Sequence, residues 1–189
     1  LDPQFALAYI GLADTLDLEV TYSNAPRDAT FKTAEMAIDK ALKLDPDLAD
    51  AWVSSAAIAA ERGQYGRAEQ LFRRAIELNP NNATAYHWFS GVLAELGRID
   101  ESLTNAQRAV DLDPLSAIIN LWFSIPLQYA GRFDEADARI RKAIEIDPSM
   151  PSSYRQLGLL RAYSMNRFAE AVPLLAKAVF ETILDFQGH

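Results

Sequence analysis

Few residues in this sequence are of a type that could carry out catalysis or hold a metal ion. The chain has no cysteine, which removes disulfides, thiolate catalysis and cysteine-based zinc sites. Its two histidines, His87 and His189, are too few for a histidine-rich metal centre. We expect His87, between Tyr86 and Trp88, to be a packed or solvated side chain; the alternative is ligand contact or pH sensing. The sequence therefore predicts no metal site and no cofactor.

Two pairs of adjacent carboxylates, Asp100-Glu101 and Asp134-Glu135, have the residue types used in general acid–base chemistry. Both pairs stand where a helix is expected to start, and negative charge there interacts favourably with the positive end of the helix dipole. No serine stands in a motif with a histidine and an acid, and no glycine-rich phosphate loop follows a strand. We therefore predict that the chain is not an enzyme.

Composition narrows the classes of partner. The chain has 189 residues, of which 50% are apolar, but no apolar run approaches the roughly 18 residues needed to span a bilayer. The net charge of −8 and the pI of about 4.8 argue against nucleic acid as a partner. The acidity is concentrated in residues 1–50, which indicates either a solvated surface or a bias toward a basic partner there. The absence of cysteine favours the cytoplasm, although the periplasm stays open.

A dipeptide ending in proline recurs every 34 residues, at Asp45-Pro46, Asn79-Pro80, Asp113-Pro114 and Asp147-Pro148. Each follows a similar helix ending, because proline lacks an N–H and restricts the residue before it. Leu1-Asp2-Pro3 is the same ending without its helix, and no initiator Met is present. We therefore expect a fragment of a longer protein, and we interpret residues 187–189 as a possible tag remnant.

Each period has room for two helices. The first are expected over 49–61, 83–96 and 117–130, and they stop at Gly63, Gly97 and Gly131, since glycine adopts left-handed dihedrals without strain. The second are expected over 67–78, 100–112 and 134–146. Loops of two to four residues make the two helices of each period antiparallel.

Small residues recur at equivalent places and predict closely packed helix axes, where a large side chain would cost roughly 1–3 kcal/mol. On first helices they are Ala13, Ala56, Ser90, Ser124 and Gly158. On second helices they are Ala34, Ala68, Ser102, Ala136 and Ala171, followed by Ala41, Ala75, Ala109, Ala143 and Ala178.

The run Ala83-Thr-Ala-Tyr86, Leu96-Gly97-Arg-Ile-Asp-Glu101 and Ala109-Val-Asp-Leu-Asp-Pro114 resembles the tetratricopeptide repeat family. The resemblance implies an all-α fold, a right-handed superhelical α-solenoid of about five antiparallel helix pairs. It implies a single array over 1–186, with repeats at about 4–46, 47–80, 81–114, 115–148 and 149–184. It also implies that first helices line a concave groove that binds peptides or proteins. More weakly, Ala6–Asp14 and Asp113-Pro-Leu-Ser116 resemble the repeat regions of bacterial multidomain regulators of the winged-helix or adenylate cyclase type.

The first pair departs from the pattern, because 43 residues separate Pro3 from Pro46. We predict that both of its helices are longer, the first reaching Tyr22 and the second starting near Pro26, with Asn24 or Ala25 as its cap. The tip residues Leu18, Val20, Tyr22 and Phe31 would pack on each other or on a preceding repeat, or would contact a partner.

A second departure lies in the fourth repeat. Pro126 is expected inside a helix, where it forces a bend that packing absorbs or that widens the groove around Ile118, Leu121 and Ile125. Asn120 stands where the family favours an aromatic residue. After Ala178 no Asp-Pro follows, and 179–186 is expected to continue the last helix.

Residues three or four apart share a helix face, so the groove can be predicted from the first helices. The predicted residues are Leu7, Ile10, Asp14, Asp50, Val53, Ala57, Glu61, Thr84, His87, Gly91, Glu95, Ile118, Leu121, Ile125, Tyr129, Ser152, Arg155, Leu159 and Tyr163. Related domains grip the carboxylate of heat-shock chaperone tails with Lys, Asn and Arg on this groove. The matching places here hold Ile10, Asp14, Val53, Ala57, His87 and Gly91, so we exclude that ligand.

Two functions remain. The first is a scaffold for protein–protein interaction that binds a peptide or partner domain in the groove. The alternative is self-association, as in a homodimer, or a regulatory domain that relays a signal to a missing N-terminal effector domain. The partner and the cellular process are not determined by the sequence.

Overall fold

A computed structural model describes residues 5–22 and 26–187, and within them the chain is all-α. The ending Leu1-Asp2-Pro3, the cap candidates Asn24 and Ala25, and residues 188–189 lie outside the described residues. The chain divides into two units, residues 1–92 and 93–189.

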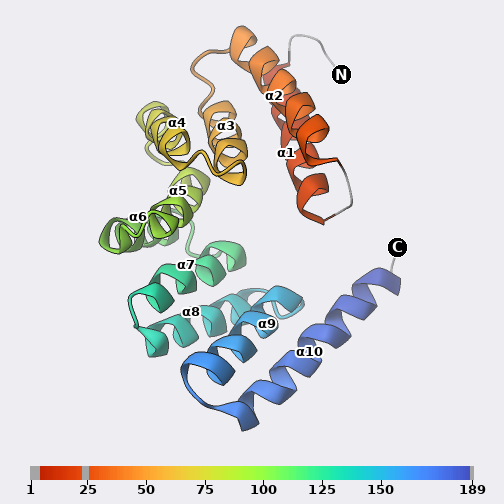
Figure 1. The fold of residues 1–189 in the computed structure, drawn as a ribbon, viewed down its shortest axis with the longest axis vertical. Helices are drawn as coiled ribbons and strands as arrows, with labels where there is room; N and C mark the ends of the chain where they lie inside the picture. Colours follow the sequence, from red (N-terminus) through yellow and green to blue (C-terminus); the bar gives the residue numbers. More distant parts are fainter. Residues whose placement is uncertain (1–4, 23–25, 188–189) are drawn as a thin grey trace. The chain divides into compact units, whose positions relative to one another are not determined.

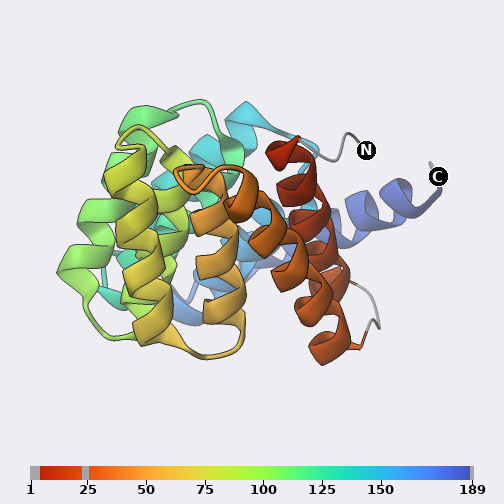
Figure 2. The same cartoon turned by 90° about the horizontal axis from the view of Figure 1, so that it is seen from above.

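Unit 1 holds α1 (Ala6–Tyr22), α2 (Arg27–Leu44), α3 (Ala49–Glu61), α4 (Tyr65–Leu78) and most of α5 (Ala83–Glu95). In Figures 1 and 2, α1 lies beside α2, and α3 beside α4, as antiparallel pairs. The predicted helices 49–61 and 83–96 agree with α3 and α5 to within one residue, and the predicted second helix 67–78 is α4, which starts two residues earlier.

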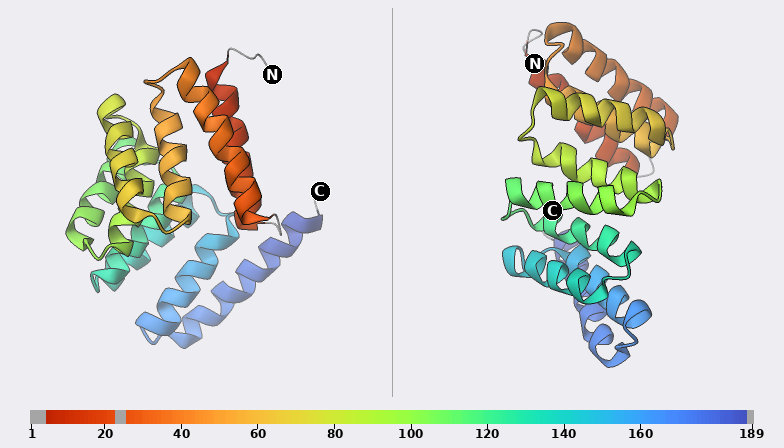
Figure 3. Two further views of the ribbon diagram at one scale, coloured as in Figure 1. Left: turned by 45° about the horizontal axis from the view of Figure 1, so that its top comes forward. Right: turned by 90° about the vertical axis from the view of Figure 1, so that its left-hand side faces the viewer.

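Unit 2 holds the rest of the chain in the same kind of pairs. Its helices are α6 (Ile99–Leu112), α7 (Ala117–Tyr129), α8 (Phe133–Ile146), α9 (Pro151–Leu159) and α10 (Phe168–Gln187), with a π-helical turn, η1 (Leu160–Ser164), after α9. Figure 3 shows α9 beside α10, and α7 packs on α8 in the same way. The predicted fold class, an all-α array of helix pairs, is confirmed.

Glycine ends the first helices as predicted. Gly63, Gly97 and Gly131 have φ of 71°, 73° and 72°, in the left-handed region. In each case the next residue closes the helix end: the N–H of Gln64, for example, donates to the carbonyl of Ala59 at 2.8 Å. These bonds satisfy carbonyls that the helix end would leave without partners.

All fifteen of the small residues are buried, and no alanine or serine among them is more than 6% exposed. Gly158 is buried as well, and a Cβ built on it would stand 2.7 Å from Cγ of Leu175. The close approach of helix axes that these residues predict is therefore present in both units.

The lengthened first pair is also confirmed, since α1 has 17 residues and α2 has 18. Val20 and Phe31 are buried in the core of this pair with Ile10 and Ile38, so the idea that these two contact a partner is wrong. These side chains are buried because the two helices are long enough for each to cover the apolar side chains of the other. The side chains of Leu18 and Tyr22 lie outside the described residues.

Asn120 keeps a hydrogen bond that its aromatic counterparts make. Trp52 donates to the carbonyl of Pro46 at 3.0 Å, and Tyr154 to that of Pro148 at 2.8 Å, in each case six residues back. The buried Asn120 amide reaches the carbonyl of Pro114 at 3.2 Å in the same way, and also that of Ser116 at 2.9 Å. The helix α7 runs on through Pro126, which is buried.

The π-helical turn accommodates one extra residue in the last repeat. Gly158 follows Ser124 by 34 residues, but Ala171 follows Ala136 by 35. The extra residue lies between those points, and a π-turn absorbs a single insertion without breaking the helix. Asn166, with φ of 55°, takes the place of the helix-ending glycine, a conformation that asparagine tolerates better than most residues.

The same turn positions Arg161 for a buried ion pair. Its guanidinium donates to both oxygens of Asp137 on α8, at 2.7 Å and 3.2 Å, and Arg141 donates to Asp137 Oδ2 at 2.8 Å. Burial would raise the pKa of Asp137, but the hydrogen bonds and charges of the two arginines outweigh it and hold that pKa below its ordinary value.

Candidate interaction surface

One candidate surface is a hollow of about 470 Å³ within unit 1, which we call the N-terminal hollow. It is formed by three helices, α1, α3 and α5. The residues that line it are Leu7, Ile10, Gly11, Asp14, Asp50, Val53, Ser54, Ala57, Thr84 and Trp88. Its walls are therefore mainly apolar, with two carboxylates, one from α1 and one from α3.

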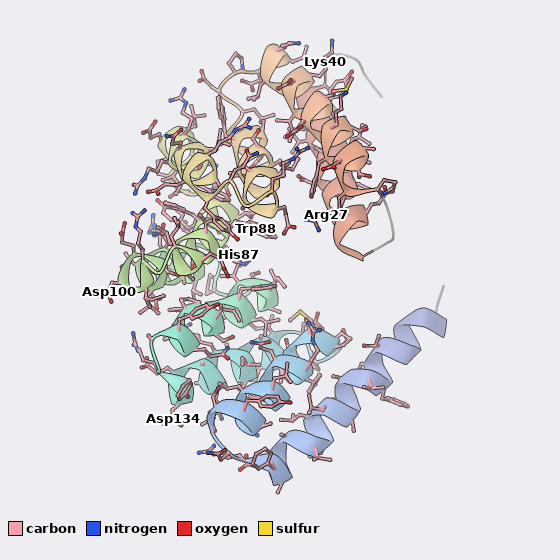
Figure 4. The ribbon with its side chains drawn as sticks, viewed as in Figure 1. Arg27, Lys40, His87, Trp88, Asp100 and Asp134 are labelled. Atoms are coloured by element: carbon pink, nitrogen blue, oxygen red, sulfur yellow. The ribbon has the colours of Figure 1, made fainter. Side chains whose placement is uncertain are left out.

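Helix packing determines which side chains reach this hollow. Ile10 and Val53 are buried and form its floor, whereas Leu7 and Trp88 are about half exposed and form its sides. In Figure 4, Trp88 projects from α5 on the side of that helix where α3 lies. Such a combination of apolar walls and a few polar groups is typical of surfaces that hold a peptide side chain.

The carboxylate of Asp14 connects two of the helices. Ser54 of α3 donates its hydroxyl to Asp14 Oδ1 at 2.6 Å. Burial raises the pKa of Asp14; the Ser54 hydrogen bond lowers it in part, and the negative charge of Asp50 raises it further. The side chain of Asp50 accepts a hydrogen bond from the Asn82 amide at 2.8 Å.

The structure brings together most of the residues predicted for unit 1. Leu7, Ile10, Asp14, Asp50, Val53, Ala57 and Thr84 all line the N-terminal hollow. His87 and Gly91 do not line it, nor does Glu61, which forms an ion pair with Arg27 at 3.1 Å. Gly11, Ser54 and Trp88 line it and were not predicted.

His87 is mostly covered, with its ring centroid 5.4 Å from that of Trp88. Burial lowers the pKa of His87 to about 4, so its imidazole is neutral at pH 7. A neutral, packed side chain agrees with the expectation that we preferred for His87.

Unit 2 has a smaller hollow of about 50 Å³, the C-terminal hollow, between α7 and α9. It is lined by Leu121, Trp122, Ile125, Ser152, Arg155 and Gln156. Four of these residues belong to the predicted groove face. The other predicted residues Ile118, Tyr129, Leu159 and Tyr163 are exposed and do not line the C-terminal hollow. Leu121 is only 5% exposed, so a charge introduced there would disrupt the fold as well as the surface.

The adjacent carboxylates stand at helix starts, as expected: Figure 4 shows Asp100 at the start of α6 and Asp134 at the start of α8. The glutamate that follows each of these aspartates forms an ion pair with an arginine three residues before it. Arg98 contacts Glu101, and Arg132 contacts Glu135, both at 2.6 Å. The hydrogen bond from Arg132 lowers the pKa of Glu135. Both glutamates are thus occupied in local ion pairs.

Comparison with known families agrees with this geometry. Residues 31–83 and 59–121 each match a family model described as tetratricopeptide repeat. Together with helix pairs of the same kind in both units, these matches, which cover residues 31–121, show tetratricopeptide repeats in the chain. No curated protein sequence matches the chain.

Several solved structures share the fold. TTC0263, a thermophilic tetratricopeptide repeat protein of Thermus thermophilus, is 20% identical over 97% of this chain and 94% of its own, with a TM-score of 0.81. MamA is 21% identical over 91% of this chain and 96% of its own, with a TM-score of 0.67. YrrB, described as having an unusual peptide-binding site, is 24% identical over 95% of this chain and 88% of its own, with a TM-score of 0.60.

The family defines the class of protein, a module for protein–protein interaction. In the described part of the chain, no helix combines the length and the apolar character that crossing a bilayer requires.

Proposed function

We propose that the chain binds a peptide, or an extended segment of a partner protein, against the first helices of its pairs. The observation that supports this proposal is the N-terminal hollow, with its apolar walls and its volume of about 470 Å³. A hollow of this size takes one or two side chains of a ligand, so micromolar affinity is the expected order, because ordering the peptide offsets much of the gain.

The prediction that the chain has no catalytic activity belongs to the same proposal. Tetratricopeptide repeat proteins are generally non-catalytic scaffolds, and the paired carboxylates that could suggest acid–base chemistry are explained by helix starts and by their arginine partners. The cytoplasmic location and the exclusion of nucleic acid also stay predictions from the sequence.

A peptide selection tests the proposal. The whole chain is panned against a displayed library of random nonapeptides, and enriched sequences are synthesised and titrated by calorimetry. We expect Trp88→Ala to weaken binding roughly 10-fold, because an exposed aromatic wall of the hollow is lost. Leu7→Ser should weaken it by a similar factor.

The matched control is Met36→Ser, which makes the same kind of change at an exposed apolar residue of α2 that does not line the hollow. It should bind as the unsubstituted chain does. If the library yields no binder, or if Trp88→Ala and Leu7→Ser bind as well as Met36→Ser, the proposed function is wrong.

Self-association is the second candidate, because α10 carries an exposed apolar face. Phe168, Val172, Val179 and Phe180 are each about 60–66% exposed in unit 2, although Val110, at the repeat position of Val179, is buried. Sedimentation at several concentrations tests this candidate. A dimer that dissociates in Val172→Glu would support it, and a monomer at all concentrations would contradict it.

A further inference from the structure

The N-terminal hollow carries charge that the protein itself does not neutralise. Among the described residues, neither Asp14 nor Asp50 forms an ion pair, and each receives one hydrogen bond, through Oδ1, from a neutral group. The Oδ2 atom of each carboxylate has no hydrogen-bond donor in the described part of the chain.

Other carboxylates that connect helices in this protein have cationic partners. Glu61 is paired with Arg27, Glu35 with Arg62, and Asp137 with Arg161. Asp14 differs because burial and the neighbouring charge of Asp50 both raise its pKa. A cation placed between these two carboxylates would relieve that repulsion, whereas the free protein leaves it in place.

The surroundings of the two carboxylates determine what kind of cation fits. The remaining walls are largely apolar, from Leu7, Ile10 and Val53, which suits the aliphatic stem of a long side chain rather than a hydrated metal ion. The exposed ring of Trp88 lines the same hollow and offers a face over which a cation is attracted. In the described residues, no three metal-ligating side chains come together.

We propose that the N-terminal hollow binds a peptide segment with a lysine or arginine side chain flanked by aliphatic residues, the cation lying between Asp14 and Asp50. This inference rests on the proposed function, because it names the chemistry of the ligand for the same surface. The excess of acidic over basic residues in 1–50, ten against four, adds a favourable long-range field for such a ligand.

The same peptide library tests the inference, read for the composition of the enriched sequences. We expect enrichment of Lys or Arg next to Leu, Ile or Val with the unsubstituted chain, and loss of that enrichment with Asp14→Asn/Asp50→Asn. Asparagine keeps the size of each side chain and an oxygen that accepts the Ser54 or Asn82 hydrogen bond. The matched control, Asp28→Asn/Asp39→Asn, removes two exposed charges from α2 outside the hollow and should keep the enrichment.

A titration then locates the cation. One enriched peptide is compared with a version in which norleucine replaces its lysine, which removes the charge and keeps the aliphatic stem. The replacement should weaken binding roughly 10-fold with the unsubstituted chain and less than about 2-fold with Asp14→Asn/Asp50→Asn. If circular dichroism shows that the double variant does not fold, the single variant Asp50→Asn, at an exposed residue, replaces it. The effect of the norleucine replacement should then differ from that in the unsubstituted chain by a smaller factor in the same direction.

The outcomes separate the two proposals. If no peptide is enriched, the proposed function fails and the inference fails with it. If peptides are enriched without basic residues, or if the norleucine replacement weakens binding equally in both proteins, the inference is overturned while the proposed function stands.

Discussion

Among the described glycines, Gly158 lies at the closest contact between helices, and its substitution by alanine tests the packing. The new Cβ would stand 2.7 Å from Cγ and 2.8 Å from Cδ2 of Leu175, and 3.3 Å from the carbonyl oxygen of Ala171. Leucine can shift, but the backbone oxygen of α10 moves only with the whole helix. Overpacking of this kind costs about 1–3 kcal/mol, and the better helix propensity of alanine offsets about 1 kcal/mol of it. We therefore expect Gly158→Ala to lower the free energy of unfolding by about 1 kcal/mol.

Gly91→Ala is the matched control, because Gly91 is also helical and a Cβ there meets no atom within 4 Å. It should raise the stability by about 0.5–1 kcal/mol through helix propensity alone. Urea denaturation followed by circular dichroism measures both variants, with unchanged slopes required for comparison. A second substitution, Leu175→Ala, should cost less in the Gly158→Ala background than in the unsubstituted chain. Equal stability of Gly158→Ala and Gly91→Ala would refute the close approach of α9 and α10.

Three further predictions concern stability and pH. Gly97→Ala, at φ of 73°, should lose about 1–2 kcal/mol by urea denaturation although no atom lies near the added Cβ, because the backbone conformation itself is strained; an unchanged midpoint would contradict this. The pKa of His87 is lowered to about 4 in the folded state. As the pH falls below about 6.5, His87 therefore binds a proton in the unfolded state but stays neutral in the folded state. Stability should therefore drop by about 2 kcal/mol between pH 7 and pH 5, and His87→Gln should remove that drop in urea titrations at the two pH values. The pKa of Asp137 is also lowered, so the stability that its charge contributes is present above about pH 4 and is lost below it. Asp137→Asn should lower the free energy of unfolding by about 2 kcal/mol or more at pH 7, because it leaves Arg161 partly unpaired. An unchanged free energy of unfolding would show that the ion pair does not stabilise the fold.

The helix pairs could be predicted from the sequence because particular residue types mark where each helix ends. Proline after the second helices of the first four pairs and glycine after the first helices of the middle three pairs restrict the backbone directly, so the helix ends follow from single residues such as Pro80 and Gly97. The small residues were equally informative, since only Gly, Ala and Ser allow two helices to approach at those positions. Long-range ion pairs such as that of Arg161 with Asp137 could not be predicted in this way, because they depend on the rotation of one helix against another.

The π-helical turn shows how a spacing carries information that residue types do not. Phe133 and Phe168 begin equivalent second helices, yet they are 35 residues apart and not 34. That one-residue difference is visible in the sequence, and it requires either a longer loop or a wider helical turn. The chain adopts the wider turn, and Arg161, which pairs with Asp137, lies within it.

The residues that the groove prediction missed share one position of the repeat. Ser54, Trp88, Trp122 and Gln156 follow each other by 34 residues, and all four line a hollow, the first two in unit 1 and the last two in unit 2. Gly11 corresponds to Ser54 once the longer first pair is allowed for. The prediction chose residues by helix spacing and passed over this position, although Ser54, for example, stands four residues after the predicted Asp50 and so shares its helix face. In the structure this position, one residue after Val53 or His87, lines a hollow in each unit. Variation at this single repeat position, from glycine and serine to tryptophan and glutamine, therefore gives each hollow its own shape.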